Sequence, residues 1–174
     1  MNRFKLFFKV LKSYVRYSHD IDLHGFALGV NSSIDLENDI HILPLDFDIT
    51  DFEKVNESVH ELQIYWNLSD AFVYKSKKGF HVFFYFDQMP YTRVKMMINF
   101  AKYVDPMYRH ISRFYDHKTI RVAGKYKEHD ISFFKVIPGP RKPTLKELEL
   151  GELKKKEHDQ LMSFHSEINK DVLL

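Results

Sequence analysis

The chain has 174 residues, a formal net charge of +2 and no cysteine. Without cysteine, disulfide bonds and zinc sites built on thiolates are excluded. No apolar run is long enough to cross a bilayer, and residues 2–17 have the lysine spacing of an amphipathic helix rather than a signal peptide. We therefore expect a cytoplasmic protein without a membrane segment.

The charge is distributed unevenly along the chain. Residues 1–74 contain 6 Lys/Arg and 12 Asp/Glu, whereas residues 75–142 contain 15 Lys/Arg and 5 Asp/Glu. A local excess of positive charge of this size favours a phosphate-rich partner. The alternative is a set of solvated helix faces with no common ligand.

In the first part of the chain, the pattern predicts a helix at residues 2–17, a strand at Gly25–Val30 and a longer strand at Ile40–Ile49. Asp51–Trp66 follows as a helix. Its apolar side chains recur at spacings of three and four, at Val55, Val59, Leu62 and Trp66.

The second part of the chain begins with two aromatic and β-branched runs within Ala71–Phe86, which predict a hairpin. Helices are then expected at Tyr91–Tyr103 and after Pro106, with Asp105 as the N-cap of the second. The next expected elements are strands at Thr119–Val122 and Ile131–Ile137. One possible arrangement pairs these two strands through a turn near residues 127–130. The last expected element is a charged helix at Thr144–His165, interrupted at Gly151.

Asp46 and Asp48 stand two residues apart at the end of the predicted strand Ile40–Ile49. Because strand side chains alternate, both carboxylates face one side while Leu45 and Phe47 face the other. Two neighbouring carboxylates are costly unless a positive charge neutralises them, and a divalent cation does so well. The alternative is that the pair only ends the strand.

The hairpin carries polar groups at its tip. Ser76, Lys77-Lys78-Gly79 and His81 combine a hydroxyl, two ammonium groups, an imidazole and a glycine that suits the positive φ of a short loop. Together with free backbone N–H groups, these residues predict a polyphosphate site. The alternative for His81 is a structural role in the strand.

The order of these motifs resembles the catalytic core of the archaeo-eukaryotic primase and primase-polymerase superfamily. D-x-D is followed by S-x-x-G-x-H and then by a hydrophobic residue and aspartate ahead of R-x-x-G, as in Tyr115-Asp116, Arg121 and Gly124. The resemblance covers roughly residues 25 to 137. It implies an α+β, primase-polymerase-like fold, in which an antiparallel sheet like that of RNA-recognition motifs is flanked by helices.

The resemblance also implies an activity, namely template-directed transfer of nucleotides from (d)NTPs by two Mg²⁺ or Mn²⁺ ions. Asp46, Asp48 and Asp116 would hold the metals. Asp105 also fits the third position, but its expected capping role gives it a structural explanation, so Asp116 is favoured. The expected nucleotide-binding residues are Ser76, Lys77, Lys78, Gly79, His81 and Arg121, and the expected nucleic-acid contacts are Lys118, Lys125 and Lys127.

The expected partners are a nucleic-acid template or primer, nucleoside triphosphates, and a helicase or accessory replication protein. Residues 1–143 would form the catalytic domain and residues 144–174 a charged helical tail. The main alternative is a catalytically degenerate module that binds nucleic acid or a replication partner. A D-x-D glycosyltransferase leaves the hairpin motif unused, and a rolling-circle Rep nuclease would need a pair of histidines on one strand, where only His81 is found.

Overall fold

The computed structural model describes residues 27–35, 37–124 and 131–172. The helix expected at residues 2–17, the turn at residues 127–130, Lys125 and Lys127 lie outside this part of the chain. The strands are β1 (Ala27–Asn31), β2 (Ser33–Asp35), β3 (Ile40–Phe47), β4 (Ala71–Lys75), β5 (Phe80–Met89), β6 (Thr119–Gly124) and β7 (Ser132–Ile137). The helices are α2 (Phe52–Trp66), α3 (Tyr91–Phe100), α4 (Pro106–Ile111) and α5 (Leu145–Val172).

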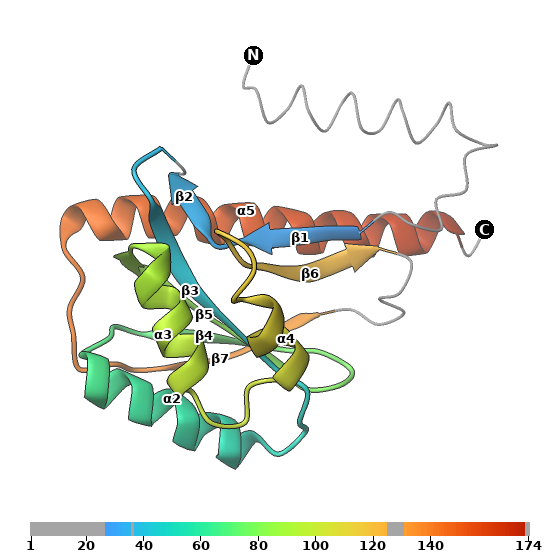
Figure 1. Cartoon of the computed structure of the whole chain (residues 1–174). Coiled ribbons are helices and arrows are strands. Elements are labelled where there is room, and N and C mark those ends of the chain that lie inside the picture. Colours follow the sequence, from blue (N-terminus) through green and yellow to red (C-terminus); the bar gives the residue numbers. More distant parts are fainter. Residues whose placement is uncertain (1–26, 36, 125–130, 173–174) are drawn as a thin grey trace.

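Two antiparallel sheets make the protein an α+β fold (Figure 1). One sheet has five strands in the order β2-β3-β5-β4-β7, and β1 pairs with β6 in the other. Because β3 and β4 each run antiparallel to β5, they are parallel to one another, and α2 connects them. This is a split β-α-β unit. In one expected arrangement, the last two strands pair with each other. The structure differs, because β6 pairs with β1 and β7 pairs with β4.

The five-stranded sheet is buried between helices. On one face, Phe80 of β5 contacts Phe52 at the start of α2. On the other face, Phe83 packs on His158 of α5. Figure 1 accordingly shows α2 and α5 on different sides of the sheet. This covering on both faces explains why β5 is mostly apolar and is buried along nearly its whole length instead of alternating.

Helix α5 is continuous from Leu145 to Val172 and is not interrupted at Gly151. Gly151 is buried, and a Cβ atom there would lie 2.3 Å from Cδ1 of Phe86. The glycine therefore allows close packing of the helix on β5 instead of ending the helix. Lys154, His158 and Leu161 are also buried, so this first part of the expected tail belongs to the core. No helix in the described ranges has the length and apolar character needed to span a membrane.

Within the core, a hydrogen bond joins the Tyr85 hydroxyl to Nδ1 of His158. Burial lowers the pKa of His158 to about 3. In the unfolded chain, where a histidine has a pKa of about 6.5, His158 is therefore protonated at a higher pH than in the folded protein. The free energy of unfolding consequently decreases as the pH falls from about 6.5 towards 3. We expect the free energy of unfolding to drop by several kcal/mol over this range, since each pKa unit is worth about 1.4 kcal/mol.

Urea titrations at several pH values test this expectation. His158→Leu should flatten the dependence on pH, whereas His60→Gln, at an exposed position of α2, should leave it unchanged. An equally steep loss of stability in His158→Leu would assign the acid sensitivity to other groups.

Candidate nucleotide and metal site

Asp46 lies near the end of β3, and the strand ends at Phe47, two residues earlier than expected, so that Asp48 follows it. Leu45 and Phe47 are fully buried, whereas the Asp46 side chain is 28% exposed and Asp48 is exposed just beyond the strand. The two carboxylates therefore stand at the open end of a strand whose other side chains form the core.

The hairpin lies directly beside this pair. Strands β4 and β5 are joined by the loop Ser76–Gly79, in which Ser76 N donates to Gly79 O at 2.9 Å and Gly79 N donates to the Ser76 hydroxyl at 3.3 Å. A Cβ atom on Gly79 would lie 1.8 Å from Phe47 O and 2.8 Å from Ile49 N. Gly79 is thus required by close backbone packing against the segment that carries Asp48, and not by the positive φ expected from the sequence.

His81 lies opposite Asp46 in the register of β3 and β5. Its Nε2 atom is 3.5 Å from Asp46 Oδ1. His81 is only 2% exposed, so in this structure the ring contacts the aspartate from within the core. An imidazole in this place holds the Asp46 carboxylate in a defined orientation.

Asp105 approaches the same end of β3 from the loop before α4. Its backbone N–H donates to Asp46 O at 2.9 Å, and its Oδ1 accepts from Tyr108 N at 2.6 Å, which caps α4. The Tyr108 hydroxyl donates to Pro44 O at 2.9 Å. Two contacts therefore fix this loop along the edge of β3, next to Asp46. The N-cap and the proline at the first helical position confirm the sequence prediction.

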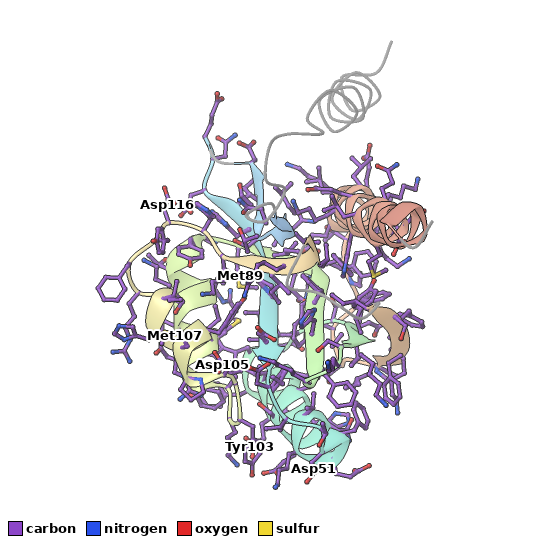
Figure 2. The ribbon with its side chains drawn as sticks, turned by 90° about the vertical axis from the view of Figure 1, so that its right-hand side faces the viewer. Asp51, Met89, Tyr103, Asp105, Met107 and Asp116 are labelled. Carbon is purple, nitrogen blue, oxygen red and sulfur yellow. The ribbon has the colours of Figure 1, made fainter. Side chains whose placement is uncertain are left out.

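Asp116 lies elsewhere. Its side chain is 86% exposed and is 2.7 Å from Nδ1 of His117, which lowers the pKa of Asp116. Burial lowers the pKa of His41, whereas the charge of Asp116 acts to raise it. His41 precedes Asp46 by five residues on β3, so these two residues are about 16 Å apart along the strand. Figure 2 shows Asp116 well separated from Asp105. Asp105, not Asp116, is the residue whose backbone contacts Asp46.

Lys118, which the sequence predicted to contact nucleic acid, is buried near these aspartates. It is 5% exposed, donates from Nζ to Tyr108 O at 2.8 Å, and lies 3.9 Å from the centre of the Tyr108 ring. Burial lowers the pKa of Lys118 to about 8, while Asp46 and Asp105 act in the opposite direction. Lys118 therefore places a cation near the aspartates, instead of the surface contact with nucleic acid that was expected.

The remaining predicted residues are more exposed. Lys77 and Lys78 are exposed on the hairpin loop, and Ser76 is half-buried there. Arg121 is exposed on β6, in register with Gly29 of β1, and so belongs to the smaller sheet. The structure therefore brings the hairpin loop to the D-x-D pair, whereas Arg121 lies on a different sheet.

The aspartates offer the hard oxygen donors that Mg²⁺ and Mn²⁺ prefer. Within residues 27–35, 37–124 and 131–172, no group of three or more His, Asp or Glu side chains has the spacing of a metal site. Asp46, Asp48 and Asp105 thus have the donor chemistry of a cation site without forming a closed cage.

Comparisons with protein-family models, with curated proteins and with solved structures gave no match for this chain. The function must therefore be inferred from the arrangement of its own residues.

Proposed function

We propose that the protein is a cytoplasmic primase-polymerase that transfers nucleotides from (d)NTPs to a growing strand, with Asp46, Asp48 and Asp105 as its acidic residues. The observation that carries the proposal is the meeting of three separate segments at one end of β3. Asp105 N binds Asp46 O, His81 lies beside Asp46, and Gly79 packs on the backbone next to Asp48. Segments 24 to 59 residues apart in the sequence thus meet at this end of β3.

The chain's own residues have separable roles in this chemistry. Asp46, Asp48 and Asp105 would hold Mg²⁺ or Mn²⁺, which when bound neutralises phosphate charge and activates the attacking hydroxyl. The ammonium groups of Lys77 and Lys78 attract the triphosphate to the hairpin loop. His81 orients Asp46. Phosphoryl transfer depends mainly on positioning and charge neutralisation, which is what this set of side chains supplies.

One observation favours a second function, a non-catalytic module that binds nucleic acid. Lys118 brings a buried positive charge close to Asp46 and Asp105, and His81 lies on Asp46. The Lys118 charge offsets part of the carboxylate charge without any metal ion. A site of this kind is stable as it stands and requires no catalytic cation.

A primer-extension assay distinguishes the two functions. The protein is incubated with a labelled primer on a DNA or RNA template, dNTPs or NTPs, and increasing Mg²⁺ or Mn²⁺. We expect extension that requires template and rises with the metal concentration. If the protein binds the primed template with no extension under any metal and nucleotide combination, the binding module is the correct function.

A further inference from the structure

Among the described strands, β7 is the last of the five-stranded sheet, and it exposes two aromatic side chains that are adjacent in sequence. Phe133 is 53% exposed and Phe134 is 43% exposed. The register shifts at this point, because Val73 pairs with Lys135 but Tyr74 pairs with Phe133. Such an irregularity changes the direction of side chains at a sheet edge. It places large apolar rings where solvent reaches them.

Both rings are held by contacts with aromatic neighbours. Phe133 meets Tyr74 with ring centres 5.7 Å apart at an interplanar angle of 77°. Phe134 meets Phe52 at 5.0 Å and 63°, and Phe80 at 5.5 Å. Edge contacts of this kind fix the rings while leaving part of each surface open. Fixed, half-exposed aromatic rings are the platforms on which bases of single-stranded nucleic acid stack.

The strands that carry and neighbour these rings, and the loop between β4 and β5, are rich in lysine. Strand β4, the loop Ser76–Gly79 and strand β7 contain four lysines and no acidic residue, namely Lys75, Lys77, Lys78 and Lys135. All four are exposed, and Nζ of Lys135 lies 5.0 Å from the centre of the Phe52 ring. This combination of aromatic rings and lysines complements bases and phosphates together.

Phe133 is connected with Asp46 through the sheet, whereas Phe134 lies on the other face of β7, against Phe52 and Phe80. Asp46 pairs with His81, His81 with Tyr74, and Tyr74 with Phe133, across β3, β5, β4 and β7. Directly opposed residues in antiparallel strands share a face, so the four side chains form one row. Three strand spacings separate Asp46 from Phe133, about 14 Å.

We propose that the β7 edge, formed by Phe133, Phe134 and Lys135 together with Lys75 and the lysines of the hairpin loop, binds single-stranded nucleic acid. This inference rests on the proposed function in one respect, since it identifies the bound strand as the template. Addition of a peptide strand to the same edge would derive its affinity mainly from backbone hydrogen bonds. It would require neither the two exposed rings nor the four lysines.

Fluorescence anisotropy with a labelled thymidine oligonucleotide, without metal or nucleotide, tests the proposal on the full chain. Phe133→Ala and Phe134→Ala should each raise the Kd about fivefold or more, the size expected for one stacked base. Phe133→Leu should have the same effect, because leucine keeps apolar packing on Tyr74 but lacks a flat ring. Lys78→Ala should lower the slope of log Kd against log salt by about 0.7. Tyr65→Ala, which removes a 70% exposed ring of α2, serves as the control and should leave the Kd unchanged.

An unchanged Kd in Phe133→Leu and Phe134→Ala, with melting temperatures near that of the wild type, would overturn the proposal. If these variants instead abolish self-association in light scattering and leave the Kd unchanged, the edge is an interface with a second copy. The outcome is separable from that of primer extension. If oligonucleotide binding depends on the two rings but the protein does not extend a primer, the proposed binding surface is supported and nucleotide transfer is rejected.

Discussion

Asp46→Asn and Asp105→Asn are each expected to lower metal-dependent nucleotide incorporation more than about 100-fold. Loss of groups that merely support metal ligands costs 10 to 100-fold, and a ligand itself should cost more. The fold should persist in both variants. Asparagine caps a helix as well as aspartate does, and Asp46 binds Asp105 through a backbone oxygen.

Asp116→Asn is the matched control for these variants. Its carboxylate is exposed and contacts His117, away from the D-x-D pair, so its rate of incorporation should equal that of the wild type. Steady-state primer extension at saturating Mn²⁺ gives all three rates. Loss of activity in Asp116→Asn together with full activity in Asp105→Asn would reverse the assignment of the third aspartate.

Gly79→Ala is expected to lower the free energy of unfolding by about 3 kcal/mol or more. The added Cβ would meet Phe47 O at 1.8 Å and Ile49 N and O at 2.8 Å. Excess volume in a core commonly costs 1 to 3 kcal/mol when side chains can shift. Here the obstacle is backbone, so the hairpin loop must move away from the segment that carries Asp48.

Chemical denaturation of Gly79→Ala and Lys78→Ala measures this cost. Lys78 is exposed on the same loop, and its replacement should change stability by less than about 0.5 kcal/mol. We also expect Gly79→Ala to impair incorporation, because the loop and Asp48 separate. A loss of stability below about 1 kcal/mol would show that the close packing is not required.

Local patterns predicted the elements that hold the site. The apolar spacing of α2 correctly identified Val55, Val59 and Leu62 as buried. Alternation correctly separated Asp46 from the buried Leu45 and Phe47. The aromatic runs around the hairpin loop likewise became β4 and β5. These predictions succeeded because they depend on residues that are neighbours in sequence.

The aspartate that we propose as the third of the site could not be chosen by the same means. Asp105 was assigned a capping role, and it has one, but the cap uses Oδ1 while the backbone of the same residue binds Asp46. A structural role and a place in the site are therefore compatible. Lys118 was expected at the surface because its local sequence shows no sign of burial. The residues that contact it, Tyr108 and Ser32, are not its neighbours in the chain.

A crystal structure with Mn²⁺ and a non-hydrolysable nucleoside triphosphate, with the ions located by anomalous scattering, tests the proposed metal site most directly. We expect two ions about 3.5 to 4 Å apart, bound by the carboxylates of Asp46, Asp48 and Asp105, with the triphosphate against the loop Ser76–Gly79. Ions absent from these carboxylates at saturating Mn²⁺, with Lys118 still beside Asp46 and Asp105, would contradict nucleotide transfer and identify the protein as a binding module.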